Sequence, residues 1–199
     1  MEEVGAILDP MQVQVIDLAA AADGRPLPRE PEEDADSFSG NAAIKALCYA
    51  RWSGMTCLAD DSGLVVDALD GAPGIFSARY AGTGGSRTDR DMENNRRLLR
   101  ELDGVPGPER TARFVCAMCL ARPDGMIIAE TRGTFEGRIT LEPHGDNGFG
   151  YDPLLWLDDA GCTSADLDPG EKNARSHRAE AARAMVDRLR TMRLIACRE

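Results

Sequence analysis

Apolar positions recur along the chain with the two-residue period of strands in some segments and with the longer period of helices in others. In MQVQVIDL, for example, Val13 and Val15 alternate with glutamines, as expected for a half-buried strand. Alternation of this kind, together with short apolar runs, predicts strands at residues 11–18, 55–60, 64–67, 111–122, 126–135, 137–141 and 154–157. Pro123-Asp124-Gly125, between two of these strands, has the composition of a hairpin turn.

Helices are predicted from capping residues and from apolar positions spaced three or four apart. Ser37 is placed to cap a helix that runs from Phe38 to about Ser53, and Gly54 is placed to end it. Further helices are predicted at residues 4–8, from Thr88 or Asp89 to near Gly104, and from about Ser176 onward. The apolar sides of the last two are expected to carry Met92, Leu98 and Leu99, and Ala181, Met185, Leu189 and Met192. Helices that alternate with strands indicate an α/β fold.

The segment from Ala19 to Asp36 is rich in proline, glycine and acidic residues. Such a composition predicts an exposed loop, and we interpret its run of acidic residues as a solvated surface. The chain shows no internal repeat and no clear linker. Its 199 residues fit one domain that spans residues 1–199.

Composition and charge narrow the class of protein. The chain has 23 basic and 34 acidic residues, a net charge of −11, which argues against a general nucleic-acid binder. Any phosphorylated substrate must therefore meet local cations or a metal ion. The sequence has no apolar run of membrane-spanning length and no signal-peptide pattern at its start. Its six cysteines do not form the framework of a small disulfide-rich protein, so we expect a reducing, cytoplasmic location.

Cys116 and Cys119 form a CxxC sequence within an apolar run. Residues three apart on a strand point to opposite faces, so these two sulfur atoms are not expected to share a metal ion. We therefore predict that both cysteines belong to the core.

Asp60-Asp61-Ser62-Gly63 follows an apolar strand and is the strongest candidate for chemistry. Carboxylates at the end of a strand are well placed to hold a divalent metal ion and its water. Because neighbours on a strand point in opposite directions, only one of the two aspartates is expected to face a site. The alternative is a turn in which an aspartate caps the strand.

Three further polar groups have both a functional and a structural interpretation. Asn41 and Lys45 share a face of the helix that follows Ser37, where a solvated surface is the alternative. Residues 148–153 place two aromatic side chains among glycines, which suits stacking on a nucleobase but also a tight turn packed into the core. The third group surrounds the start of the last helix and comprises Lys172, His177 and Arg178. Its cations and the free N–H groups of the helix suit an anion or a polarised carbonyl, and a chance cluster on the surface is the alternative.

Taken in order, these segments resemble the inosine/xanthosine triphosphate pyrophosphatase family, which acts on noncanonical purine nucleoside triphosphates. The matching stretches are SFSGNAAIKA, LADDSGLVVDALDGAPGIFSARYAG, the helix with Asn95 and Leu98-Leu99, RTARFVCAMCLARPDG, GFGYDPLL and TSADLDPGEKNARSHR. They extend from about residue 37 to the last helix. Each motif alone is weak, but six in the same order are specific.

The resemblance implies a fold, an activity and partners. The fold is a long, twisted mixed sheet flanked by helices, with two lobes around a central cleft, usually in a homodimer. Family members use Mg²⁺ to hydrolyse XTP, ITP and dITP to the monophosphate and pyrophosphate, which removes these nucleotides from the pool. The implied partners are purine nucleoside triphosphates and a second copy of the chain, with no nucleic acid and no membrane.

The resemblance also assigns roles to individual residues. Asp61 would be the general base and, with Asp60 beside it, would hold the metal ion. Ser62 and Lys172 would contact the substrate. A base-side loop would stack Phe149 on the purine, and its members are Phe149, Gly150, Tyr151 and Asp152. His177 and Arg178 would recognise the 6-keto edge, so that a 6-amino group leaves buried donors unpaired at a cost of about 1–3 kcal/mol each.

The chain departs from the family pattern in two places. Members normally begin with a strand and a Ser/Thr-x-Asn-x-x-Lys loop that grips the phosphates, whereas this chain begins at MEEVGAIL. We expect either a start codon upstream of Met1 or an inactive nucleotide-binding relic. Gly40 stands where many members have a glutamate that contributes to the metal site. A related pyrophosphatase that prefers modified pyrimidines is a further alternative, which residues 149–152 and 176–178 disfavour.

Overall fold

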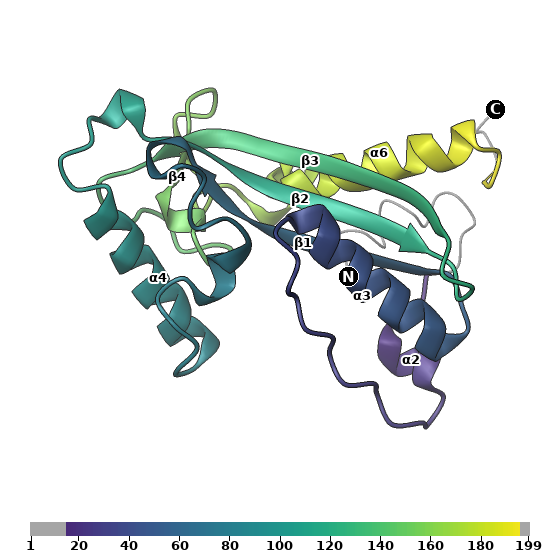
Figure 1. Ribbon diagram of the computed structural model, residues 1–199. Coiled ribbons are helices and arrows are strands. Elements are labelled where there is room, and N and C mark those ends of the chain that lie inside the picture. Colours follow the sequence, from purple (N-terminus) through teal and green to yellow (C-terminus); the bar gives the residue numbers. More distant parts are fainter. Residues whose placement is uncertain (1–14, 196–199) are drawn as a thin grey trace. The chain divides into compact units, whose positions relative to one another are not determined.

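The computed structural model describes residues 15–195, which form an α/β fold with a five-stranded sheet flanked by helices (Figure 1). The strands are paired in the order β1-β2-β3-β4-β5, with the bounds β1 Cys57–Val66, β2 Thr111–Ala121, β3 Ile127–Ile139, β4 Leu155–Leu157 and β5 Cys162–Thr163. The pairings of β4 with β3 and with β5 are antiparallel. The predicted α/β class is confirmed.

The structure contains five α-helices among the described residues, and one of them, α3, has the bounds that its capping residues predicted. Their bounds are α2 Leu18–Ala22, α3 Phe38–Ser53, α4 Arg87–Glu101, α5 Pro169–Arg175 and α6 His177–Thr191. At the start of α3 the Ser37 hydroxyl accepts the Gly40 N–H at 3.2 Å, and Gly54 ends the helix with a left-handed φ of 74°. The predicted bounds of α3 are therefore confirmed.

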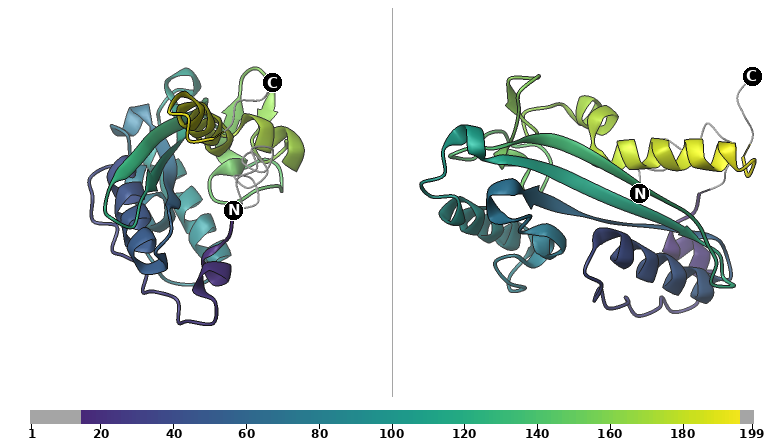
Figure 2. Two further views of the ribbon diagram at one scale, coloured as in Figure 1. Left: turned by 90° about the vertical axis from the view of Figure 1, so that its right-hand side faces the viewer. Right: turned by 45° about the horizontal axis from the view of Figure 1, so that its top comes forward.

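The chain divides into two compact units. Unit 1 comprises Met1–Asp61, Cys116–Gly133 and His177–Glu199, and unit 2 comprises Ser62–Val115 and Thr134–Ser176. In unit 1, α3 and α6 lie on opposite faces of the strands (Figures 1 and 2). The alternation of side chains along β2 produces this arrangement, because residues two apart share a face.

Cys116 and Cys119 illustrate the alternation in β2. Cys116 packs with Met185 and other residues of α6, whereas Cys119 packs with Ala42 and Ala46 of α3. Both cysteines are fully buried. The prediction that they point to opposite faces and belong to the core is confirmed.

The core of unit 2 is built from strand, helix and loop side chains around Leu64 and Leu98. α4 contributes Leu98, which is fully buried, whereas Met92 on the same helix is 45% exposed. The prediction that Met92 lies on the apolar side of the helix is therefore wrong. The same holds for Met192, which follows the end of α6 and is 46% exposed.

β1 passes straight through the segment in which the sequence suggested an interruption. Asp60, Asp61, Ser62 and Gly63 all lie within the strand, so the alternative of a turn at this place is wrong. Gly63 is needed for close packing rather than for a turn, because a Cβ atom there would lie 2.4 Å from the Ser77 hydroxyl oxygen. Likewise β3 continues to Ile139, where two shorter strands were predicted.

Short elements account for most of the remaining differences. α2 lies at the start of the predicted loop, capped by the Asp17 carboxylate, and neither β5 nor α5 was predicted. These elements are too short for a periodic pattern to emerge. The predicted helix at 4–8 and most of the predicted strand at 11–18 lie outside the described residues, and 15–17 are not in a strand.

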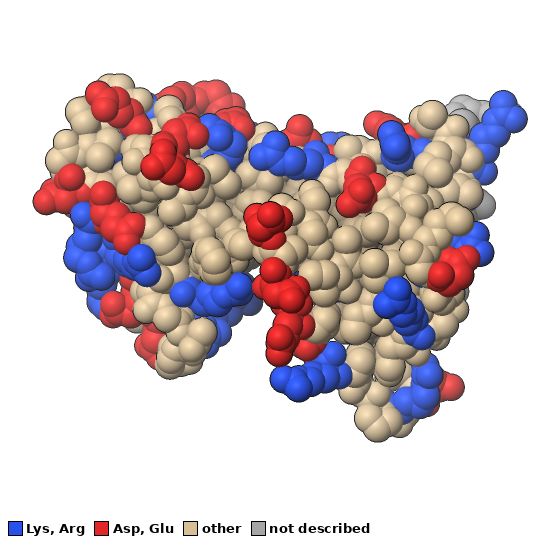
Figure 3. All heavy atoms as spheres, in the orientation of Figure 1, with Lys and Arg blue, Asp and Glu red and all other residues tan. Residues whose placement is uncertain are grey.

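The described part of the chain contains no helix that is both long enough and apolar enough to cross a membrane. Acidic and basic side chains are interspersed over the face seen in Figure 3.

Candidate active site

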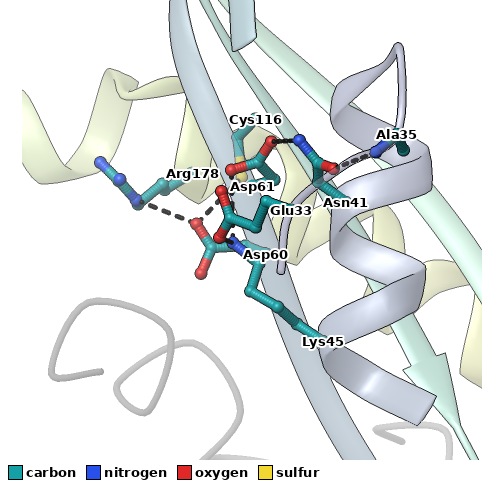
Figure 4. Close-up of polar contacts among 8 residues, drawn as sticks. All are labelled: Glu33, Ala35, Asn41, Lys45, Asp60, Asp61, Cys116 and Arg178. Carbon is teal, nitrogen blue, oxygen red and sulfur yellow. Dashed lines mark hydrogen bonds and ion pairs between the residues drawn. The ribbon is translucent and has the colours of Figure 1, made fainter. Parts of the chain in front are cut away.

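The predicted site residues fall into two clusters, one in each unit. The Asp61 cluster lies in unit 1 and consists of Glu33, Asn41, Lys45, Asp60, Asp61 and Arg178 (Figure 4). The Asp152 cluster lies in unit 2 and consists of Phe149, Asp152, Ser164 and Lys172. Ser62, which is half-buried, follows Asp61 in β1.

Two side chains of α3 hold the Asp61 carboxylate. Asn41 donates to Oδ2 at 3.2 Å, and the Lys45 ammonium lies 3.3 Å from Oδ1. Asn41 and Lys45 are four residues apart, so one face of the helix presents both (Figure 4). Burial raises the pKa of Asp61 above its ordinary 3.8, and the attraction of Lys45 and the hydrogen bond from Asn41 offset only part of that rise.

Lys45 contacts a second carboxylate that the sequence did not single out. Its ammonium lies 2.8 Å from Glu33, and the side chains of Lys45, Glu33 and Asp61 are only 15%, 23% and 12% exposed. Burial alone would lower the pKa of Lys45, but the two carboxylates outweigh burial and raise it above 10.5. The ammonium group is therefore firmly charged.

The orientation of the Asn41 amide is fixed from the other side. Asn41 is fully buried, and its Oδ1 accepts the Ala35 N–H at 3.1 Å, so its NH₂ group is directed to Asp61. Ala35 and Glu33 both belong to the acidic segment that we interpreted as a solvated loop. That interpretation is wrong at these two positions, since the segment supplies two contacts to the Asp61 cluster.

Asp60 contacts a different cation. Its Oδ2 lies 3.4 Å from Nε of Arg178 at the start of α6 and 3.8 Å from the Cys116 thiol (Figure 4). His177, the first residue of α6, is buried. The backbone of α6 lies so close to β3 that a Cβ atom on Gly133 would be 2.3 Å from the His177 carbonyl oxygen.

The carboxylate oxygens of the Asp61 cluster suit a small, hard cation that takes only a few of its ligands from the protein. A carboxylate has about four lone-pair directions, and Asn41 and Lys45 occupy only one at each oxygen of Asp61. Mg²⁺ commonly binds one or two carboxylates while phosphates and waters complete its shell. Among residues 15–195 no three His, Cys, Asp or Glu side chains are grouped to hold a metal ion.

Asp152 is the centre of the cluster in unit 2. It is 3% exposed and accepts from the Ser164 hydroxyl at 2.9 Å, from the Phe149 N–H at 2.8 Å and from the Lys172 ammonium. Gly148 has a φ of +82°, and a Cβ atom there would lie 2.2 Å from an Asp152 oxygen. Glycine is therefore needed to bring the loop this close to Asp152.

The two aromatic residues of the loop have opposite environments. Phe149 is 49% exposed, with the Arg87 guanidinium 4.7 Å and the Lys172 ammonium 5.3 Å from its ring centre. Tyr151 is 5% exposed, and its hydroxyl donates to the Ser77 carbonyl at 2.9 Å. Burial raises the pKa of Tyr151 far above its usual range. The core-packing alternative thus applies to Tyr151, whereas Phe149 presents a ring that a base can reach.

α4 contacts the same loop through side chains one turn apart. Asp91 accepts the Gly150 N–H at 3.0 Å, and Asn95 donates to the Gly150 carbonyl at 3.0 Å. A cavity of about 580 Å³ lies beside these contacts, and both residues line it together with Arg87 and Phe149. Asn95 lies in one of the stretches that carry the family resemblance, whereas no sequence motif assigned Arg87 or Asp91 to a site. Helical spacing of polar residues was the only signal present.

Comparison with known proteins agrees with the resemblance found in the sequence. Residues 1–188 match the Ham1 family. A dITP/XTP pyrophosphatase from Nitratidesulfovibrio vulgaris is 46% identical over 93% of this chain and 89% of its own length, and one from Pseudomonas aeruginosa is 50% identical over 80% and 79%. A HAM1 protein structure from Coxiella burnetii covers 96% of this chain and 92% of its own, with a TM-score of 0.84 and 36% identity. The structure of the Staphylococcus aureus Ham1 protein covers 96% of this chain and 93% of its own, with a TM-score of 0.81 and 34% identity. The chain therefore belongs to the Ham1 family.

Proposed function

We propose that this chain hydrolyses noncanonical purine nucleoside triphosphates, namely XTP, ITP and dITP, to the monophosphate and pyrophosphate. Its relatives include proteins named dITP/XTP pyrophosphatases that match over most of their length. The observation in this chain that carries the proposal is the Asp61 carboxylate, which Asn41 and Lys45 hold in one orientation within a half-buried cluster.

Asp61 is the proton acceptor in this reaction. A water molecule attacks phosphorus, its proton passes to the Asp61 carboxylate, and the phosphoanhydride bond breaks to release pyrophosphate. Burial raises the pKa of Asp61, which makes the carboxylate a better base than an exposed aspartate. Asn41 and Lys45 orient the carboxylate so that its remaining lone pairs are available to the water.

Local cations offset the charge of the triphosphate. The net charge of the chain is −11, so its long-range field repels such a substrate. Lys45 and Arg178 place positive charge in the Asp61 cluster, where three carboxylates outnumber them, so a metal ion would have to supply the balance there. Lys172 places positive charge in the Asp152 cluster. These side chains are held by carboxylates and are thus ordered before a substrate arrives.

Mg²⁺ is the proposed cofactor. Asp61 would hold the ion, whereas Asp60, the second proposed ligand, contacts Arg178 on the other side of the strand and is expected to contribute less. When bound, the ion neutralises charge on the phosphates and lowers the pKa of a coordinated water. Gly40 supplies no carboxylate, so the metal would depend on Asp61 and on the substrate itself.

Selectivity for the base is assigned to Phe149 and to donors near α6. The exposed Phe149 ring offers a face for stacking, and Ser62, Gly150, Tyr151 and Asp152 remain proposed substrate contacts. Lys172 is a further proposed substrate contact, and His177 and Arg178 carry donors that suit a 6-oxo group. An amino group at this position would leave such donors unpaired, so we expect ATP to be a poor substrate.

We also propose a homodimer and a cytoplasmic location, each on a single kind of support. The homodimer is supported by the family resemblance alone and is measured directly by light scattering of the purified chain. The location is supported by the cysteine content, since the described cysteines, Cys48, Cys57, Cys116, Cys119 and Cys162, are all free thiols.

The decisive experiment is pyrophosphate release by this chain with Mg²⁺, measured for XTP and dITP beside ATP and GTP. We expect turnover of the first pair and little of the second. The donors to the 6-oxo group account for rejection of ATP alone, because GTP carries the same 6-oxo group. If all four substrates remain intact, the chain is an inactive member of the family. Turnover of ATP at the rate of dITP would overturn the assignment of base selectivity.

A further inference from the structure

The loop that carries Phe149 is held on two sides. On one side Asp152, itself buried, accepts the Phe149 N–H at 2.8 Å. On the other side α4 holds the next residue, because Asp91 accepts the Gly150 N–H and Asn95 donates to the Gly150 carbonyl, both at 3.0 Å. Both polar atoms of Gly150 are therefore fixed by one helix.

The contacts from α4 come from successive turns of one helical face. Arg87, Asp91 and Asn95 are spaced four residues apart, so their side chains point to the same side of the helix. Arg87 lies over the Phe149 ring, while Asp91 and Asn95 hold the backbone beside it. The position of the ring thus depends on a stripe of polar residues that the reaction itself does not use.

The hydrogen bonding of the Asn95 amide is not explained by its contribution to stability alone. Its NH₂ group bonds to Gly150, but its Oδ1 is buried and no described residue donates to it. A buried acceptor without a donor destabilises the fold. An apolar residue here would avoid that cost, but it would leave the Gly150 carbonyl without the contact that holds the loop.

We infer that Asp91 and Asn95 are positioning residues for base recognition, which set the place of the Phe149 ring against a bound purine. The inference rests on the proposed function in one respect, namely that Phe149 stacks on the base. Base stacking is made equally in the ground state and the transition state, so loosening the ring should weaken binding and raise KM with little change in kcat.

The test measures binding and turnover separately. The dissociation constant for dITP is determined by calorimetry with the metal chelated, for the wild type and for Asn95→Ala, each with and without Phe149→Ala. We expect Asn95→Ala to weaken binding about tenfold in the wild-type background, as loss of one buried hydrogen bond implies. In the Phe149→Ala background we expect less than about a twofold effect, since residues that act through a common group are not additive.

Two further variants separate positioning from folding. Asp91→Asn keeps an acceptor for the Gly150 N–H and should retain most of the affinity that Asp91→Ala loses. Arg96→Ala is the matched control, because the Arg96 side chain lies on the same helix, is 61% exposed and pairs with Glu93 one turn away rather than with the loop. It should leave affinity, KM and kcat unchanged.

The possible outcomes bear separately on the positioning role and on the proposed function. Unchanged affinity in Asn95→Ala, or an equal loss with and without Phe149, overturns the positioning role. Wild-type protein that binds dITP but does not hydrolyse it with Mg²⁺ overturns the proposed function and leaves the positioning role to be judged by the binding cycle. Wild-type protein that does not bind dITP overturns both.

Discussion

Asp60 and Asp61 are neighbours in β1, yet their carboxylates contact different cations from different helices. Asp61 contacts Lys45 of α3, and Asp60 contacts Arg178 of α6. The preceding residues follow the same alternation, since Leu58 packs with the α6 cluster and Ala59 with the α3 cluster. The strand thus assigns one aspartate to each side of the sheet in unit 1, as the sequence predicted from strand geometry.

Asp61→Asn should abolish most turnover while dITP still binds. The amide keeps the shape of the carboxylate but cannot accept a proton at neutral pH, and loss of a general base commonly costs about 100-fold or more in kcat. Steady-state pyrophosphate release gives kcat, and calorimetry in a chelator gives the affinity. Near-normal turnover in this variant would remove Asp61 from its assigned role.

Asp60→Asn should have a much smaller effect of another kind. Its contact with Arg178 is partly exposed, with side chains 39% and 26% accessible, and such ion pairs contribute about 0.2–1 kcal/mol. We expect KM for dITP to rise about two- to fivefold, because Arg178 is less well ordered, with kcat nearly unchanged. If kcat instead falls as far as in Asp61→Asn, Asp60 belongs to the catalytic centre and its contact with Arg178 is secondary.

Stability should depend on pH through Asp61 in a direction opposite to that of most carboxylates. The pKa of Asp61 is raised by burial, so the folded state binds this proton more tightly than the unfolded state. Stability from this group is therefore lost as the pH rises from 3.8 through the folded pKa. The amide introduced by Asp61→Asn cannot ionise, so that variant should be more stable than the wild type at pH 7.

The difference between the two proteins should disappear as the pH falls below 3.8, where Asp61 is protonated in both states. Urea unfolding without metal, at several pH values, measures it. A variant less stable than the wild type at pH 7 would mean that the ion pair with Lys45 outweighs the cost of burial.

The sequence predicted those features of the fold that depend on neighbouring residues, such as helix caps and the residues that share a helix face. Ser37 and Gly54 fixed the bounds of α3, and the spacing of Asn41 and Lys45 placed both on one face. β1 was harder, because the polar residues that suggested an interruption find their partners on distant segments. Periodicity describes a residue's neighbours along the chain and carries no information about such partners.

Glu33 shows the same limit at the site itself. It lies in an irregular, acidic segment, where a single sequence offers no period from which to place a side chain. Only the folded chain brings it to Lys45. Similarly, nothing in the two aromatic residues of the 148–153 loop distinguishes exposed Phe149 from buried Tyr151.

Gly133 is predicted to be essential for the position of α6. A Cβ atom there would lie 2.3 Å from the His177 carbonyl oxygen and 2.5 Å from the Ala181 nitrogen, both of them backbone atoms that a side-chain rotation cannot move away. Gly133→Ala should therefore shift the helix start and lower the free energy of unfolding by about 1–3 kcal/mol.

Gly84→Ala is the matched control, because no atom lies within 4 Å of the position that its Cβ would take and its φ is not in the left-handed region. That substitution should be neutral or stabilise the protein by about 0.4–1 kcal/mol. Since the His177 end of α6 also carries Arg178, Gly133→Ala should raise KM for dITP as well, whereas an unfolding curve and KM that both match the control would show that β3 and α6 are less tightly packed than the structure indicates.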